Sequence, residues 1–257
     1  MIGVIALREW REQSRQPAMW VAVAVLYVAV GGLGVTAVWL LDYIAATPEL
    51  AAQLQQWLPA MGVDATALPQ LVGSVVTIAN WLMFTQMLGF CAVNAGHALL
   101  HDRQTGTLPF LLLAPLGRLE LMIGKVLGAI GIAVLLQWVI WGVFAGLITT
   151  RPLAAAAAGE LPGQAAWWVA FGLGGPAWAM FIGGICALIS STTRDVRAAQ
   201  QLVWLVMFVA TFAGGGLLAG RMADGAWIEL EIAFAGLCCA AATLWIGRLT
   251  LQRDVGR

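Results

Sequence analysis

The amino-acid sequence predicts an all-α integral membrane protein with six transmembrane helices. Three observations lead to this fold class: 61% of the 257 residues are hydrophobic, the mean hydropathy is +0.87, and the apolar residues gather into long runs. A soluble protein of this composition would expose large apolar patches. A run of about 20 apolar residues, in contrast, is long enough to cross a bilayer as a helix. We therefore treat the chain, 1–257, as a single transmembrane domain.

The first segment, 1–17, predicts an amphipathic helix that lies on the membrane surface. Charged residues recur on one helical face and apolar residues on another. The charged set is Arg8, Glu12 and Arg15, and the apolar set is Val4, Leu7 and Trp10. Pro17 then ends the helix before the first apolar run. Such a helix places its arginines against anionic headgroups; the alternative is that these arginines only orient the chain.

Six apolar runs follow, and each has the length of a membrane span. They cover about 19–41, 72–99, 124–148, 166–190, 200–220 and 227–247. The first two are joined by a long external loop, 42–71, which has acidic residues but no Lys or Arg and contains a short amphipathic helix. Glycines spaced four residues apart allow helices to approach closely, and they occur at Gly124/Gly128, Gly142/Gly146 and Gly216/Gly220.

The distribution of Lys and Arg predicts the orientation of these spans. If the N-terminus is cytoplasmic, six spans place eleven of the 13 basic residues on the cytoplasmic side: Arg8, Arg11, Arg15, Arg103, Arg118, Lys125, Arg194, Arg197, Arg248, Arg253 and Arg257. Only Arg151 and Arg221 lie outside. An excess of basic residues marks cytoplasmic loops, so we expect both termini in the cytoplasm and the chain in the inner (plasma) membrane.

Polar residues within the second and third spans are candidates for a translocation path. Asn80, Met87 and Asn94 are spaced by seven residues and form one stripe, and Gln137 in the third span could meet it. Intramembrane amides face either a wet cavity or a partner helix. The sequence leaves both readings open: these residues line a path, or they form hydrogen bonds between helices.

The sequence contains no catalytic motif that we recognise. Gly124-Lys125 is followed by Val126 and lacks the upstream glycine of a phosphate-binding loop. His97 and His101 lie one helical turn apart, a spacing that can hold a metal, but no third ligand is recognisable. The four cysteines lie in apolar runs, as packing residues do. We expect no catalytic residue, metal, cofactor or nucleic-acid partner, so the chain is predicted not to be an enzyme.

The segment between spans two and three, 101–123, is unlike a simple loop. It contains a polar entry, a short apolar helix candidate at Leu108–Leu113, a break at Ala114–Gly117, and an amphipathic stretch that leads into the third span. Apolar side chains on the cytoplasmic side of a membrane protein indicate contact with another protein. We therefore expect a docking element for a cytosolic partner.

The stretch "HDRQTGTLPFLLLAPLGRLELMIGK", His101–Lys125, resembles the signature of ABC type-2 exporter permeases. The matching residues are Arg103, Gly106-Thr107-Leu108, Leu111-Leu112, Pro115-Leu116 and Gly124-Lys125. Six spans, internal termini and an N-terminal surface helix fit the same family, so the resemblance covers nearly the whole chain. Two positions depart from the pattern: Pro109 stands where an acid is usual, and Asp102 replaces the more common Glu.

This resemblance implies a permease that works with two copies of a cytosolic ABC ATPase subunit and with a second permease, either identical or a paralogue, in membrane lipid. The cytoplasmic coupling helix would seat in the ATPase through Arg103, Thr105, Gly106, Thr107, Leu108, Phe110, Leu111 and Leu112. A second, smaller contact would come from "STTRDVRAAQQ", with Arg194, Asp195 and Arg197. Substrate would pass between the two permeases.

Two other functions compete with an exporter permease. One is a haem-exporter-like or cofactor-assembly permease, which shares the docking pattern. The other is a membrane scaffold that transports nothing. An adjacent gene for an ATPase with a phosphate-binding loop would favour transport over the scaffold.

Overall fold

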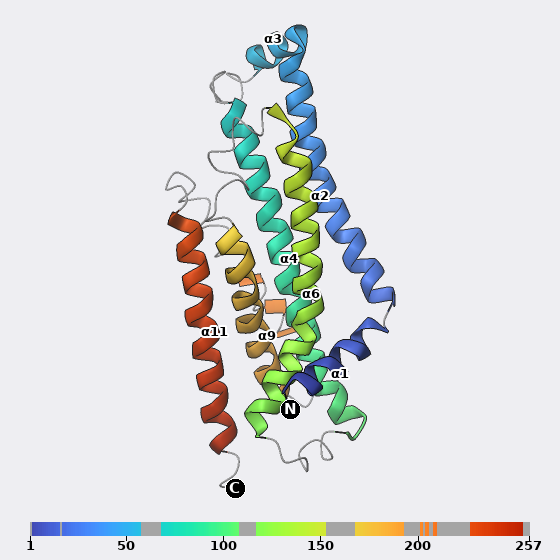
Figure 1. Ribbon diagram of the computed structural model, residues 1–257, viewed down its shortest axis with the longest axis vertical. Helices are drawn as coiled ribbons and strands as arrows, with labels where there is room; N and C mark the ends of the chain where they lie inside the picture. Colours follow the sequence, from blue (N-terminus) through green and yellow to red (C-terminus); the bar gives the residue numbers. More distant parts are fainter. Residues whose placement is uncertain are drawn as a thin grey trace.

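The structure is a computed structural model that describes residues 2–15, 17–57, 68–107, 117–152, 168–192, 201–202, 204–205, 208–209 and 227–253. Long helices dominate this part of the chain (Figure 1). They are α1 (Ile2–Ser14), α2 (Pro17–Ala46), α3 (Pro48–Trp57), α4 (Leu68–Gln104), α6 (Arg118–Thr149), the π-helical turn η3 (Ala170–Gly174), α9 (Gly175–Thr192) and α11 (Trp227–Arg253). No strand occurs in the described residues, so the all-α prediction is confirmed for them.

Among the described residues, four helices are long and apolar enough to cross a membrane. These candidate spans are Val23–Ala46, Leu71–Ala98, Leu119–Thr149 and Phe171–Ser190, and they coincide with four of the six predicted spans. The sixth predicted span coincides with α11, whose apolar part Phe234–Ile246 is shorter. The fifth, about 200–220, falls mostly outside the described residues. Six spans therefore remain a prediction.

Two helices extend further than their apolar runs suggested. α2 continues to Ala46, past the predicted end at residue 41, and Asp42 on this extension has its Oδ2 3.9 Å from Arg151 Nη1. Arg151 also stacks 4.1 Å from the ring centroid of Trp39, a cation–π contact. Within the predicted external loop, 42–71, the structure has α3 where the amphipathic helix was expected, and α4 begins at Leu68.

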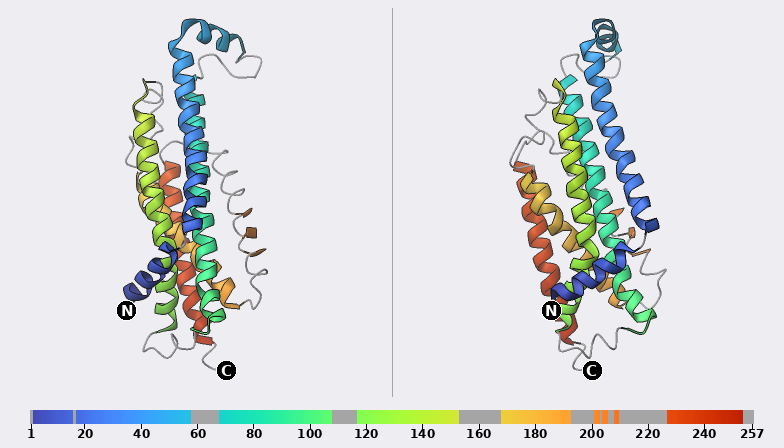
Figure 2. Two further views of the ribbon diagram at one scale, coloured as in Figure 1. Left: turned by 90° about the vertical axis from the view of Figure 1, so that its right-hand side faces the viewer. Right: turned by 45° about the vertical axis from the view of Figure 1, so that its right-hand side comes forward.

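The packing contacts give the direction of each long helix. α2 runs antiparallel to α4, since Gly31 faces Met83 and Gly34 faces Ala79. α4 runs antiparallel to α6, since Phe84 stacks on Trp141 while Ala98 contacts Lys125. α2 and α6 therefore run in one direction and α4 in the other (Figures 1 and 2).

α9 and α11 share the direction of α4. Gly175 lies beside Met87 and Gly183 beside Ala95, so residue numbers increase together along α9 and α4. In the same way, Gly236 of α11 packs on Trp178 of α9 and Thr243 packs on Gly184 (Figure 1). α9 and α11 thus run in parallel.

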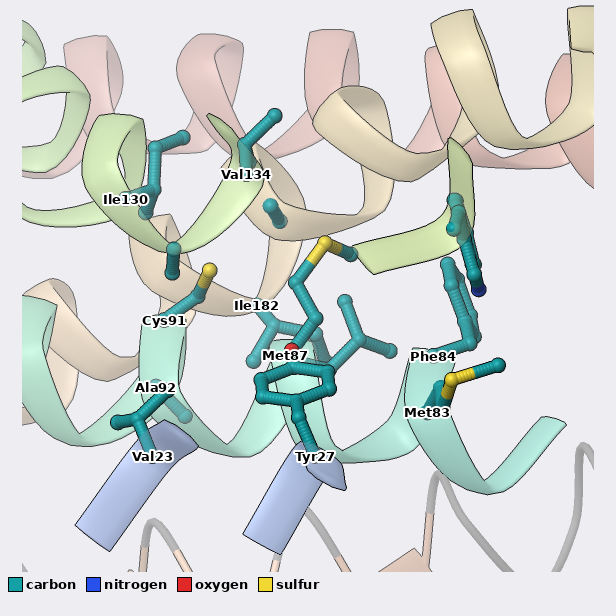
Figure 3. Close-up of a cluster of buried hydrophobic side chains, with 14 of the residues drawn as sticks. Val23, Tyr27, Met83, Phe84, Met87, Cys91, Ala92, Ile130, Val134 and Ile182 are labelled. Atoms are coloured by element: carbon teal, nitrogen blue, oxygen red, sulfur yellow. The ribbon is translucent and has the colours of Figure 1, made fainter. Parts of the chain in front are cut away.

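The core lies between α2, α4, α6 and α9. Tyr27 of α2 points towards Met87 of α4, with Cys91 on the next turn of α4 and Ile182 of α9 close by (Figure 3). Trp141 of α6 packs on Phe84 of α4 and on Phe171, at the start of the fourth span. Only 28–50% of each candidate span is buried within the chain. The apolar remainder suits lipid or a partner membrane protein, because a helix that is apolar all round needs an apolar environment.

Candidate functional site

The described flanks of the predicted docking segment lie at one end of the bundle. α4 ends and α6 begins at the end where α1 crosses α6 and where α11 ends, whereas α3 lies at the opposite end (Figures 1 and 2). The structure describes both flanks of the segment, up to Thr107 and from Gly117. Leu108, Phe110, Leu111 and Leu112 of the predicted coupling helix lie outside the described residues.

The first flank is a helix terminus built by the predicted Gly-Thr pair. Gly106 has φ of 69°, a left-handed conformation that glycine adopts without a steric cost. The Thr107 N–H donates to the Asp102 carbonyl oxygen at 3.0 Å, as in a Schellman motif. The Thr107 hydroxyl also donates to Asp102 Oδ1 at 3.0 Å and lies 3.0 Å from the hydroxyl of Thr105. The chain therefore leaves α4 in a defined direction.

The second flank is the start of α6. Gly117 occupies the N-cap position with extended backbone, φ −65° and ψ 139°, and glycine has no side chain with which to cap the helix. Instead, the Gly117 N–H donates to Glu120 Oε2 at 3.3 Å, so the acid in the first turn reaches back to the cap. This acid also complements the positive end of the helix dipole.

A buried ionic cluster, Glu9–Asp102–Lys125, joins both flanks to α1. The Lys125 ammonium donates to Glu9 Oε2 at 2.9 Å, pairs with Asp102 Oδ2, and donates to the Ala98 carbonyl oxygen at 3.2 Å. All three charged residues are almost wholly buried: Lys125 is 4% exposed, Glu9 7% and Asp102 1%. Burial raises the pKa of the Glu9 carboxyl, and the neighbouring Lys125 partly opposes this shift.

Sequence reasoning found only part of this cluster. Lys125 belongs to the Gly-Lys pair of the family signature, and Asp102 was noted only as a departure from it. Glu9 was missed. A signal was present, because Glu9 shares a helical face with Ile2, Ile5 and Gln13 at spacings of seven, four and four residues.

α1 packs against α6 through two small residues. A Cβ atom at Gly128 would lie 2.5 Å from the Glu9 Cβ and 2.7 Å from the Ala6 carbonyl oxygen, and one at Gly124 would lie 3.0 Å from the Ile5 Cβ. The glycine pair predicted to bring helices together therefore does so with α1. Close contact of the two backbones brings Glu9 within reach of Lys125.

The outward faces of α1 agree with the predicted amphipathic pattern. Val4, Leu7 and Trp10 are exposed, as large apolar side chains on a membrane-surface helix would be. Arg8 pairs with Glu12 at 3.0 Å on another exposed part of the helix. The buried face, with Ile5, Ala6 and Glu9 towards α6, is a third face that the sequence analysis did not separate.

The predicted path residues lie inside or near the core of the single chain. Asn80 and Met87 are buried and Asn94 is half-buried on α4. Gln137 is fully buried, and its amide is placed to donate to the Tyr27 hydroxyl at 2.6 Å and the Met83 carbonyl oxygen at 3.2 Å while accepting from Trp141 Nε1 at 2.7 Å. Gln137 thus links α2, α4 and α6. Its contacts are those expected of a residue that joins helices, and a role in a path remains a prediction.

The predicted second contact, Arg194, Asp195 and Arg197, lies outside the described residues. α9, which leads into it, ends at the same end of the bundle as α4. The Ser190 hydroxyl of α9 donates to the Gly96 carbonyl oxygen of α4 at 2.6 Å. The end of α9, from which the chain continues to the predicted second contact, therefore lies at the docking end.

The helices and their apolar surfaces define a multi-pass membrane protein. A family model described as ABC-2 family transporter protein matches residues 4–235, most of the chain. The chain belongs to this family, and it is a membrane permease of an ABC transporter, a class that associates with an ABC ATPase subunit. A search of curated proteins finds no match.

Proposed function

We propose that this chain is the transmembrane subunit of an ABC exporter and moves substrate across the membrane with ATP hydrolysed by a separate ATPase subunit. Two such ATPase copies would act with two permeases, either identical or paralogous. The observation that carries the proposal is the family match over residues 4–235, together with the fixed flanks of the docking segment. The catalytic step is assigned to the ATPase, and the permease supplies the path.

The coupling contact in this proposal is the segment that begins at Arg103 and Thr105–Thr107 and continues through Leu108 and Phe110–Leu112. The supporting geometry is that the Gly106 turn fixes its first flank and the Gly117–Glu120 cap fixes its second. A segment anchored at both ends can transmit a force from an ATPase to α4 and α6. Arg194, Asp195 and Arg197 would add the second contact.

The proposed orientation places the docking end in the cytoplasm of a cell with the protein in its inner (plasma) membrane. Arg8, Arg11, Arg15 and Lys125 lie at this end of the bundle, whereas Arg151 lies at the other. Basic residues favour the cytoplasmic side. α1 would then lie at the inner membrane surface, with Val4 and Leu7 available to lipid.

Six spans remain part of the proposal. The supporting observation is the parallel packing of α9 and α11. Helices that cross in the same direction require a return between them, and the apolar run at about 200–220 has the length for it. An even number of spans would leave both termini in the cytoplasm.

The experiment that tests the function is purification of the chain with its genomic neighbours, followed by reconstitution in lipid. We expect an ABC ATPase to copurify and the complex to hydrolyse ATP, while the chain purified without that subunit shows no turnover. Turnover by the chain alone, or failure of any ATPase to copurify, would contradict the proposal. A scaffold without transport would bind neighbours but show no ATP-dependent uptake into inverted vesicles.

A further inference from the structure

The Lys125 ammonium connects three helices. Its partners are Glu9 on α1 and, on α4, the carboxylate of Asp102 and the carbonyl oxygen of Ala98. Lys125 itself lies two turns into α6, after its start at Arg118. A single buried side chain therefore bears on α1, on the last turns of α4 and on the first turns of α6.

Asp102 extends these contacts to the start of the docking segment. Its Oδ2 pairs with Lys125, and its Oδ1 accepts a hydrogen bond from the Thr107 hydroxyl at 3.0 Å. Thr107 is the last described residue before 108–116, the part of the docking segment that lies outside the described residues. A displacement at Thr107 therefore acts on Asp102, and through Asp102 on Lys125 of α6 and Glu9 of α1.

Charged residues are an unusual choice for packing helices at such a buried position. Removing ions from water is costly, and apolar residues of similar volume often hold helices as firmly. Two carboxylates also share one ammonium within the cluster, so each carboxylate depends on Lys125. The cost of leaving a buried charge without its partner does, however, oppose any displacement that separates Lys125 from the two carboxylates.

We propose that Lys125 is a positioning residue that makes α1, the end of α4 and the start of α6 move as one unit, so that displacement of the docking segment reaches the spans. This inference rests on the proposed function, since it assigns the cluster a part in transmitting the force of the ATPase. Lys125 does not contact the ATPase or the substrate in this scheme. Its partner Asp102 holds Thr107, which the proposed function places at the ATPase contact.

The first arm of the test uses the chain alone in lipid nanodiscs. The four native cysteines are replaced by alanine, and spin labels are placed at Arg11→Cys on α1 and Val143→Cys on α6, both exposed positions. At 1.5 Å per residue along α6, position 143 lies about 22 Å from the α1 contact at Gly128, within range of pulsed dipolar measurements. We expect a narrow distance distribution in the parent and a broad one in Lys125→Met.

Two controls separate the loss of Lys125 contacts from a general loss of charge. Lys125→Arg keeps a donor cation and should keep the narrow distribution. Glu12→Gln removes an exposed acid from the same helix and should also leave it narrow. If Lys125→Met does not fold, Asp102→Asn provides a milder change of the same cluster and should broaden the distribution less. The proposal would be overturned if the variant that folds, Lys125→Met or otherwise Asp102→Asn, had a distance distribution as narrow as that of the parent.

The second arm uses the complex with its copurified ATPase, with labels at Ala46→Cys and Thr150→Cys at the far ends of α2 and α6. We expect MgATP with vanadate to change this distance in the parent. In Lys125→Met the complex should assemble and still hydrolyse ATP, because Lys125 does not contact the ATPase. The change in distance should nevertheless be lost, and Lys125→Arg should restore it.

The two arms fail in different ways. A response in Lys125→Met equal to that of the parent would overturn the positioning role. If the parent complex hydrolyses ATP but its far ends do not respond, the proposed function is contradicted, and the distance distribution of the chain alone still decides whether Lys125 holds α1 in place.

Discussion

At the scale of single residues, the burial of the Glu9 carboxyl makes the free energy of unfolding depend on pH. Burial raises the pKa of its carboxyl above the ordinary value, so between these two values the folded chain binds a proton that the unfolded chain releases. The contribution of Glu9 to the free energy of unfolding is therefore greatest at low pH. It is lost as pH rises from near the ordinary value through the raised one.

The direction of this pH dependence gives a prediction for Glu9→Gln, whose side chain cannot titrate. We expect the unfolding free energy of the parent, relative to Glu9→Gln, to increase as pH falls through the raised pKa, with a slope no steeper than about 1.4 kcal/mol per pH unit for one proton. Thermal unfolding in detergent between pH 4.5 and 8 would measure it. Glu49→Gln on α3 controls for the loss of an exposed acid that does not act on Glu9, and a difference that increases with rising pH would contradict the argument.

Gly128 allows a second prediction at this scale. An alanine there would place its Cβ 2.5 Å from that of Glu9 and 2.7 Å from a backbone oxygen, so α1 must shift. Overpacking of this kind costs about 1–3 kcal/mol. It outweighs the roughly 0.5–1 kcal/mol that alanine gains over glycine within a helix. We expect Gly128→Ala to lower the melting temperature, whereas Gly142→Ala, with open space around it, should not.

Gln137 distinguishes the two interpretations of the intramembrane amides. Gln137→Leu would leave the Tyr27 hydroxyl and the Trp141 N–H buried without this partner. Hydrogen bonds between transmembrane helices contribute about 0.6 kcal/mol on average and up to about 1.7. We expect a loss in that range, measured by unfolding in mixed micelles. Gln86→Leu is the control, because the buried side-chain oxygen of Gln86 has no hydrogen-bond partner among the described residues. A stable Gln137→Leu with altered transport would favour the path instead.

At the scale of elements, the docking segment gives a prediction that depends on the ATPase. A leucine buried at a protein contact contributes about 1.5–3 kcal/mol. Leu111→Asp with Leu112→Asp would lose two such contacts and place charges in an apolar groove. The expected loss exceeds the roughly 1.4 kcal/mol that lowers affinity tenfold. ATPase copurification should fall at least tenfold, while the melting temperature of the permease alone stays unchanged.

The control for this double variant lies on the same side of the proposed membrane. Val4→Asp with Leu7→Asp changes two exposed apolar residues of α1 that do not belong to the docking segment. We expect these changes to leave ATPase copurification intact. Wild-type recruitment and transport by the Leu111/Leu112 variant would mean that the segment is only a connection between spans.

Helices could be predicted from the sequence where the pattern of apolar residues alone was enough to identify them. Four spans are helices as expected, and α1 and α3 are helices as their amphipathic patterns predicted. The burial of Glu9 could not be predicted in the same way, because its environment comes from α6, more than 100 residues away in the chain. Helical periodicity identifies faces, but it does not tell which face meets which partner.

The same limit applied to the candidate site. The Gly-Thr pair carried its own signal, since a left-handed glycine at a helix end is a local requirement. No local pattern in the sequence indicates the role of Asp102, because this role depends on Lys125 from the next span and on the hydroxyl of Thr107. A position noted for its departure from the family pattern lies within the buried cluster.

At the scale of the whole molecule, the orientation can be tested with single cysteines in the background without native cysteines. We expect Gln104→Cys and Arg11→Cys to react with a membrane-impermeant maleimide only in inverted vesicles, and Thr150→Cys to react in intact cells. The reason is the gathering of basic residues at the docking end. Reaction of position 104 in intact cells would reverse the orientation and remove the docking argument with it.

The buried cluster also has a consequence for the order in which the protein is assembled. Glu9 leaves the ribosome first, Asp102 second and Lys125 last, and folding during synthesis begins from the N-terminus. Until Lys125, two turns into α6, has been made, both carboxylates lack the ammonium that offsets their burial, and water remains their preferred environment. α1 therefore cannot take its final position against α6 until the first turns of α6 have been synthesised.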